Sequence, residues 1–375
     1  MPMNRKHLLI LCLVIILTGC GRKIKLPTNL PELGGGTLDT TYIPIEPDRP
    51  WVEAGGIPFN HPQDVHVGFD GYIYIADTDN DRIVKLDQVG NFIDQYGGVK
   101  RPSSVSQDRL FRLLATGGNT IYKKGTQDKE FIPIYVAKDI YDTIIVTPED
   151  TVVTYDTIFV TPDSIVIDTD TVIVPAVFYV DTVVTNYEGI APNPLPFSGY
   201  AEYYACDFTR SEITKFLFYE PSTLYDLGPA IPTGYELGKT AYPLGIFTYL
   251  TPTGFNLIFS QFLSYYSVQL LNGEDFSPVI PRTDSSNIYW QGTFGQAEDV
   301  VVDEYGNIFV VDTEKNSVIK FSENGVKILS FGSQGTKGKE FQNPMGIAYS
   351  SKIVYVADTG NNRILRFMLS TDIPR

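Results

Sequence analysis

The sequence predicts an all-β protein built from one repeated unit, and three observations carry this prediction. The composition favours short strands and turns, with 32 Gly, 25 Pro and 24 Tyr among 375 residues. A strand–turn–strand phrase recurs along the chain. No stretch shows the apolar spacing of a long amphipathic helix.

The clearest copy of the phrase spans residues 355–367. Tyr355 to Ala357 reads as a strand, Asp358 to Asn362 is rich in turn formers, and the apolar pattern resumes at Ile364. Good copies also lie at 74–86 and 309–321, a looser one at 204–216, and degenerate ones near 114–121 and 257–270. In chain order, the six turns begin at Asp77, Thr116, Asp207, Gln261, Asp312 and Asp358.

Six such units, of about 40–50 residues and about four strands each, predict a six-bladed β-propeller. Radially arranged sheets leave only short, protected edges. The last copy ends after its third strand, near Phe367, while residues around 42–52 are β-prone. We therefore expect this N-terminal segment to add the outer strand of the last blade and to close the ring.

The interval between the turns at Thr116 and Asp207 is unusually long, and residues 137–186 account for the excess. This segment alternates Asp and Thr with Val and Ile, which predicts a low-complexity β-rich insertion within or beside the second blade. Its strands would have one apolar face that needs a partner. Two interpretations stay open: a recognition arm, or a tolerated elaboration whose aspartates prevent aggregation.

Residues 1–19 predict a bacterial secretory signal. Arg5 and Lys6 form a positive n-region, and the apolar core at 8–17 is too short to span a bilayer. The following Leu-Thr-Gly-Cys resembles a lipobox, so we expect cleavage before Cys20 and lipidation of this cysteine, with palmitate as an acyl chain. Residues 20–50 are rich in Pro, Gly and Thr and predict a flexible tether to a folded domain at 51–375.

These features predict a location on the bacterial cell envelope, where the lipid holds the protein to the membrane, facing the periplasm or the cell surface. Lipoproteins that are retained in the inner membrane of enteric bacteria carry an aspartate after the lipidated cysteine. Gly21 stands at this position here, and this difference favours the outer membrane. The net charge of −15 becomes more negative without Arg5 and Lys6, and such acidity argues against a nucleic-acid partner. After cleavage only Cys20 and Cys206 remain, which excludes a disulfide framework.

Several phrases resemble the NHL repeat. They are the turn phrases at 75–83 and 356–364, the Pro-x-Gly-Ile-Ala opening at 344–348, and Gly-Asn-Ile-Phe-Val at 306–310. The resemblance covers roughly 56–124 and 187–367 and implies a propeller, commonly of six blades. It does not imply one function, because NHL propellers include protein- and RNA-binding domains, receptor sensor domains and a few metal-dependent enzymes.

The aspartates of the recurring turn have one predicted role. An Asp at the start of a tight turn accepts hydrogen bonds from nearby backbone N–H groups and fixes the turn. A role that recurs in every good copy serves the repeat itself. We therefore expect a structural function for Asp77, Asp207, Asp312 and Asp358.

The segments that open each unit vary, which makes them better candidates for binding. In a propeller, the connection into each innermost strand lies near one mouth of the central channel, on the face of the recurring turns. We expect an acidic rim there, and two interpretations stay open: a site for a cation or a basic partner, or a set of solvated loops. The candidate ligand-binding residues are Gln63, Asp64, His66, Arg82, Ser104, Glu298, Asp299 and Arg363.

The leading hypothesis is a non-catalytic binding scaffold for an envelope protein, peptide or glycan, without a cofactor. The alternatives are a structural component of an envelope complex and a divalent-metal-dependent lactonase or hydrolase. The hydrolase would hold Ca²⁺ or another divalent metal on Asp64, Glu298 and Asp299. The NHL-related amidating lyases hold zinc on histidines from several blades, whereas only His61 and His66 follow the predicted signal here. The sequence shows no nucleophile elbow or phosphate loop.

Overall fold

The computed structural model describes residues 40–46, 49–137, 140–146, 160–161, 164–165, 177–183, 185–195, 200–219, 223–283 and 286–372. The predicted signal, Cys20 and most of the predicted tether lie outside these residues. Within them, no helix has the length and apolarity that a membrane span requires.

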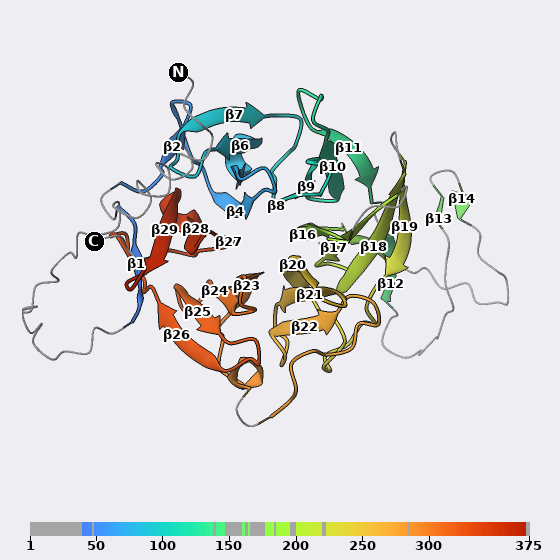
Figure 1. The fold of residues 1–375 in the computed structure, drawn as a ribbon. Helices are drawn as coiled ribbons and strands as arrows, with labels where there is room; N and C mark the ends of the chain where they lie inside the picture. Colours follow the sequence, from blue (N-terminus) through green and yellow to red (C-terminus); the bar gives the residue numbers. More distant parts are fainter. Residues whose placement is uncertain are drawn as a thin grey trace, which may run out of the picture. The chain divides into compact units, whose positions relative to one another are not determined.

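Six antiparallel sheets, each one blade of a propeller, stand around a central axis (Figure 1). In blades 1 to 5 the chain begins at the innermost strand and proceeds outwards, and in blade 6 it does so for three strands before the N-terminal strand completes the sheet. Blade 1 contains β4 (Pro62–Val67), β5 (Ile73–Asp77), β6 (Arg82–Leu86) and β7 (Phe92–Tyr96). Blade 2 contains β8 (Ser104–Gln107), β9 (Leu113–Gly117), β10 (Thr120–Lys124) and β11 (Ile132–Val136). Blade 3 contains β16 (Tyr187–Pro192), β17 (Ala201–Asp207), β18 (Glu212–Tyr219) and β19 (Thr223–Pro229).

The remaining blades complete the ring. Blade 4 contains β20 (Pro243–Thr251), β21 (Gly254–Gln261) and β22 (Val268–Asn272), and a single bridge from Leu271 to Pro278 stands where a fourth strand was expected. Blade 5 contains β23 (Ala297–Val302), β24 (Ile308–Asp312), β25 (Ser317–Phe321) and β26 (Lys327–Phe331). Blade 6 contains β27 (Ile347–Ser350), β28 (Ile353–Asp358), β29 (Arg363–Leu369) and β1 (Tyr42–Pro44). The predicted six-bladed β-propeller is confirmed.

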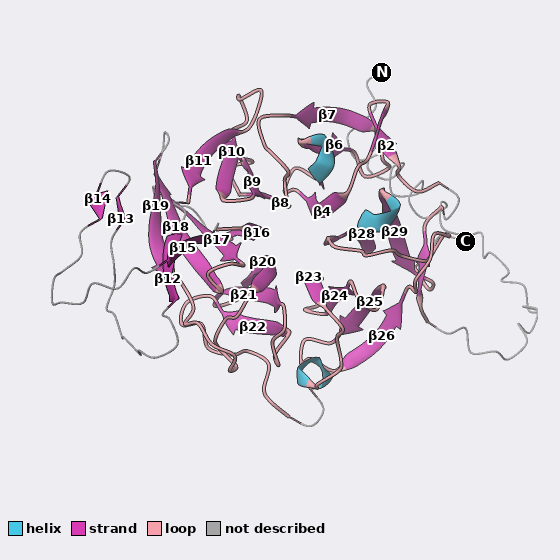
Figure 2. Ribbon diagram, turned by 180° about the vertical axis from the view of Figure 1, so that it is seen from behind, coloured by secondary structure: helices cyan, strands magenta, loops and turns pink. Residues whose placement is uncertain are grey.

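Helical structure in the described chain is limited to three single turns, as Figure 2 shows from behind. These 3₁₀ turns are η1 (Thr78–Asn80), η2 (Asn287–Tyr289) and η3 (Thr359–Asn361). A short hairpin of β2 (Glu53–Ala54) and β3 (Ile57–Pro58) precedes blade 1.

The hydrophobic core lies between neighbouring blades. The middle strands β5, β9 and β24 are buried along their whole length, whereas the outer strand β7 is exposed. Between blades 1 and 2, for example, Tyr74 and Ile83 pack with Val105 and Leu113. Because each core is shared by two blades, no blade can bury its apolar faces alone.

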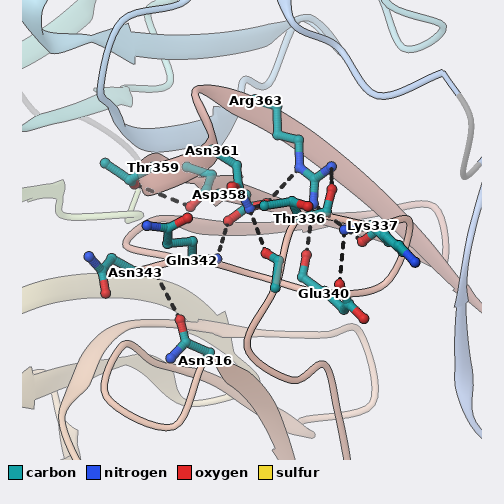
Figure 3. A network of polar contacts seen from close by, with 12 residues as sticks. Asn316, Thr336, Lys337, Glu340, Gln342, Asn343, Asp358, Thr359, Asn361 and Arg363 are labelled. Atoms are coloured by element: carbon teal, nitrogen blue, oxygen red, sulfur yellow. Dashed lines mark hydrogen bonds and ion pairs between the residues drawn. The ribbon is translucent and has the colours of Figure 1, made fainter.

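The recurring turn holds each blade together through its aspartate. Asp358 is fully buried, and its carboxylate accepts hydrogen bonds from the Gln342 N–H at 2.7 Å, Asn361 Nδ2 at 2.8 Å and Arg363 Nε at 2.6 Å (Figure 3). Asp77 has the same three kinds of partner in blade 1. Asp207 and Asp312 are likewise fully buried and accept backbone N–H groups. The turn aspartates are therefore structural residues.

Two further side chains of the turn join neighbouring blades. The threonine after the aspartate donates to the carbonyl of the proline that opens the next blade, at 2.7 Å from Thr78 to Pro102 and 2.7 Å from Thr359 to Pro62. The Asn or Asp at the end of the turn accepts the N–H before that proline, as Asn362 does from His61 at 2.7 Å. This residue has a left-handed backbone (φ +52° at Asn362), which Asn and Asp tolerate better than other side chains.

Less regular copies of the turn have other side chains at these positions and make other contacts. In blade 4, Gln261 stands at the aspartate position, and its side-chain oxygen accepts the Ala241 N–H at 2.7 Å. In blade 3, Phe208 stands at the threonine position and packs its ring 5.5 Å from Tyr242 and 6.0 Å from Phe262. Gln261 thus joins its turn to the opening of its own blade, as the aspartates do, and Phe208 joins its turn to the next blade, as the threonines do.

The N-terminal strand closes the ring, which confirms the sequence prediction. Strand β1 pairs with β29, and Trp51 forms a further bridge to Ile364. Tyr42 is buried, and its ring lies 4.9 Å from Phe331 and 5.6 Å from Phe309. An N-terminal side chain thus completes the core between blades 5 and 6.

The insertion lies between blades 2 and 3. The N–H groups of Ala137 and Tyr187, at its two ends, donate to the carbonyls of Asn119 and Gly118 at 2.9 and 2.8 Å. The segment therefore leaves and rejoins the propeller at one turn. In its described parts, β12 (Ile140–Val146) pairs with β15 (Val177–Val183), and β13 (Val160–Thr161) pairs with β14 (Ser164–Ile165).

We expect Tyr42→Ala to lower the free energy of unfolding by about 3–5 kcal/mol, the usual cost of truncating a large buried ring. Urea denaturation of the purified domain measures the change. Tyr305→Ala is the matched control, because the Tyr305 side chain is 69% exposed, and it should change stability by less than about 0.5 kcal/mol. Equal effects of the two variants would contradict closure by the N-terminal strand.

Candidate binding site in the central channel

The six innermost strands, β4, β8, β16, β20, β23 and β27, surround a central channel with a volume of about 330 Å³. These strands run in the same direction, so all begin at one mouth and end at the other. The mouth at their beginnings lies on the face of the recurring turns, since Pro62 at the start of β4 pairs with Asp77 at the end of β5. We call it the carboxylate mouth and define it by Gln63, Ser103, Glu188, Leu244, Glu298 and Met345.

One residue deeper, Asp64 and Asp299 each link two blades. Asp64 Oδ2 accepts the Val105 N–H at 2.8 Å and the Ser104 hydroxyl at 2.9 Å. Asp299 Oδ2 accepts the Ile347 N–H at 2.9 Å. Val105 and Ile347 occupy the same position in their strands, so both aspartates make the same contact to the following blade.

Glycine allows this close packing of the innermost strands. A Cβ atom at Gly346 would lie 2.6 Å from the Asp64 Cα, and one at Gly245 would lie 2.3 Å from Asp299 Oδ1. Burial raises the pKa of Asp64 to about 6, against the opposing effect of the hydrogen bonds from Val105 and Ser104. Burial, reinforced by the nearby Asp64 carboxylate, raises the pKa of Asp299 well above its usual range.

Glu188 and Glu298 stand at equivalent positions on the carboxylate mouth. Each accepts a hydrogen bond from the side-chain amide two residues earlier, Asn186 for Glu188 and Gln296 for Glu298. Burial and then the neighbouring Glu188 carboxylate raise the pKa of Glu298 to about 7, and burial raises that of Glu188. Within the described chain, neither carboxylate forms an ion pair.

The exposure of these glutamates agrees with a site at an open mouth. Both side chains are half-buried, and protein atoms surround the carboxyl groups closely enough to raise their pKa. A carboxylate that is partly desolvated and lacks a cation is destabilised relative to its protonated form. A cationic ligand would relieve this cost.

The other predicted ligand-binding residues divide into two groups. Gln63 and His66 line the channel, and burial lowers the pKa of His66 to about 4, so this imidazole is neutral at pH 7. Arg82 and Arg363 are buried, with Nε 2.7 Å from Asp77 and 2.6 Å from Asp358. These two arginines hold the recurring turns and are not available to a ligand.

The predicted metal ligands do not fit a metal ion. In the part of the chain that the structure describes, no three His, Cys, Asp or Glu side chains are grouped as a metal would require. Asp64 and Asp299 instead direct carboxylate oxygens to backbone N–H groups of neighbouring blades. We therefore derive no metal-dependent step from Asp64, Glu298 and Asp299.

The carboxylate mouth continues sideways into a second cavity, of about 320 Å³. It shares Gln63, Ser103 and Glu188 with the mouth. Its other walls include Lys100, Arg101, Gly118 and Asn186, so it reaches the turn at which the insertion joins the propeller. The acidic rim and the base of the insertion thus form one continuous surface.

Comparisons with known proteins agree with this architecture. Residues 341–367 match the NHL repeat, so the chain carries an NHL repeat within a six-bladed β-propeller. The chain is similar to an auxiliary nutrient binding protein from Bacteroides ovatus, with a TM-score of 0.55 and 12% identity over 88% of this chain and 77% of that one. A luciferin-regenerating enzyme gives a TM-score of 0.50 at 11% identity over 88% and 95% of the two chains.

A gluconolactonase from Xanthomonas campestris has a TM-score of 0.48 and 10% identity, over 88% of this chain and 97% of that one. At these identities, the two likenesses with TM-scores of 0.50 or more show the propeller fold alone. No match appears among curated proteins.

We expect Glu298→Gln to stabilise the protein more at pH 8 than at pH 5. The folded-state pKa of Glu298, about 7, lies above its ordinary value of 4.5, so its contribution to stability is present below pH 4.5 and lost as the pH rises through 7. Glutamine cannot ionise, so the variant does not lose this stability as the pH rises. Thermal unfolding midpoints at both pH values measure the effect, with Glu274→Gln, an exposed residue of blade 4, as the control.

A midpoint difference that is the same at pH 5 and pH 8 would contradict this assignment for Glu298.

Proposed function

We propose that this protein is a lipid-anchored envelope β-propeller that acts as a non-catalytic binding scaffold. Its partner is a protein or peptide that presents a lysine or arginine side chain to the carboxylate mouth. The observation that carries the proposal is the pair Glu188 and Glu298, which is partly desolvated and has no ion-pair partner in the described chain.

A basic side chain suits this pair for electrostatic reasons. Burial and the Glu188 carboxylate raise the pKa of Glu298 to about 7, so Glu298 accepts a cation with the release of a proton, and the affinity should increase from pH 6 to pH 8. Hydrogen bonds between charged groups are stronger than neutral ones in a partly desolvated site.

The insertion extends this surface in the proposal. Its two ends meet at the turn of Gly118 and Asn119, beside the second cavity. A partner held at the carboxylate mouth is therefore within reach of the insertion, which favours the recognition-arm interpretation over a neutral elaboration.

Binding of a lysine pentapeptide tests the proposal. We expect Glu188→Gln/Glu298→Gln to weaken binding at least about tenfold in calorimetric titration at pH 8, because two charge-assisted contacts are lost. Glu274→Gln/Glu323→Gln removes two exposed carboxylates and is the control for net charge. Equal weakening by both double variants, or one tightly held metal ion per chain in the purified protein, would overturn the scaffold assignment.

The anchor requires a separate test, since Cys20 lies outside the described residues. We expect wild-type cells to incorporate a palmitate analogue into the protein and to retain it in the outer-membrane fraction. Cys20→Ala should abolish both the labelling and the membrane retention. Labelling that persists in this variant would contradict lipidation at Cys20.

A further inference from the structure

The opposite end of the central channel has a different chemistry. It is lined by Phe69, Arg109, Pro194, Tyr249, Leu250 and Tyr349, and we call it the aromatic mouth. Phe69, Arg109 and Pro194 follow the ends of β4, β8 and β16, whereas Tyr249, Leu250 and Tyr349 lie in the last residues of β20 and β27. Phe69 is 54% exposed and Leu250 44% exposed, so large apolar side chains face solvent beside the cavity. A concave, mostly apolar cavity with few polar groups is the usual form of a small-molecule site.

One cation stands in these apolar surroundings. Among the described residues that line the channel, Arg109 alone carries a permanent positive charge, since His66 is neutral at pH 7. The Arg109 guanidinium lies 5.6 Å from the centre of the Phe69 ring. By contrast, the nearby Arg112 is buried and pairs with Asp108 at 2.6 Å.

The turn that presents Arg109 also departs from its counterparts. Residues 108–112 connect β8 to β9 with the hydrogen bonds that 303–307 use in blade 5. The left-handed position is Gly306 in blade 5, with φ +80°, but Phe111 in blade 2, with φ +59°. A bulky residue is unfavourable there, yet the Phe111 side chain is 48% exposed and fills no core.

From these features we propose a second binding site at the aromatic mouth, for a small amphipathic anion. Its apolar or aromatic body enters the channel past Phe69 and Leu250, and its carboxylate, sulfonate or phosphate binds the Arg109 guanidinium. This site is independent of the proposed partner site, which lies at the other end of the channel.

The electrostatics of the channel set the orientation of this ligand. The carboxylate mouth carries Glu188 and Glu298, and Asp64 and Asp299 lie just inside it. An anionic group is repelled from that end and attracted to Arg109. The apolar body therefore points inwards, and the anionic group stays at the aromatic mouth.

Two fluorescent probes separate the apolar and the ionic part of this recognition. 8-Anilinonaphthalene-1-sulfonate has an aromatic body and one anionic group, and N-phenyl-1-naphthylamine has the same body without the charge. We expect Arg109→Gln in the full-length protein to weaken sulfonate binding about tenfold and to leave the neutral probe unchanged. Leu250→Asp should weaken both probes, because it adds a charge at the aromatic mouth.

Arg282→Gln is the matched control. Arg282 is also exposed and lies 5.8 Å from an aromatic ring, that of Tyr266, but it is not part of the channel lining. It should leave both affinities unchanged, and unchanged melting curves establish that the variants are folded. The proposal is overturned if neither probe binds, if Arg109→Gln weakens the sulfonate no more than Arg282→Gln does, or if it weakens both probes equally.

Discussion

The structure depends on the buried aspartate of the recurring turn and on the two polar side chains that follow it. Asp358 joins the turn to the opening of its own blade, and Thr359 and Asn362 join it to the next one. A fully buried carboxylate is costly unless it is hydrogen-bonded, and here every partner is a main-chain or fixed side-chain donor. One turn thus determines both the shape of a blade and its angle to the neighbour.

This arrangement leaves the ends of the innermost strands free to vary. The core between blades and the turns hold each strand in place, so residues such as Glu188 and Glu298 can project into the channel without stabilising the fold. Partly desolvated carboxylates without cations are more easily explained by a ligand than by stability. At the other end, Arg109 is exposed beside the Phe69 ring, and the channel consequently has two chemically opposite mouths.

Much of the fold was predictable because the chemistry of the turn is local in sequence. Asp358, Thr359 and Asn362 lie within one short phrase. The closing strand was predictable because the last repeat of the sequence lacks its fourth strand.

The site was less predictable. Arg82 and Arg363 were among the candidate ligand-binding residues, because only strand pairing places them beside Asp77 and Asp358. Glu188 was not among the candidates, although Tyr187-Glu188-Gly189-Ile190 aligns in sequence with Ala297-Glu298-Asp299-Val300, because its opening fits the shared form less well. Arg109 lies in a turn without the glycine that blades 1 and 5 have at Gly71 and Gly306.

The central claim is that a basic partner binds at the carboxylate mouth, and photo-crosslinking in intact cells tests it most directly. A benzoylphenylalanine at Lys100, on the rim of the second cavity, is compared with one at Tyr305. Tyr305 is 69% exposed in the turn between β23 and β24, at the end of the propeller that has the aromatic mouth. The account predicts an adduct from Lys100 that disappears in the Glu188→Gln/Glu298→Gln background and is absent from Tyr305. An adduct that persists in that background, or that forms equally from both positions, would contradict it.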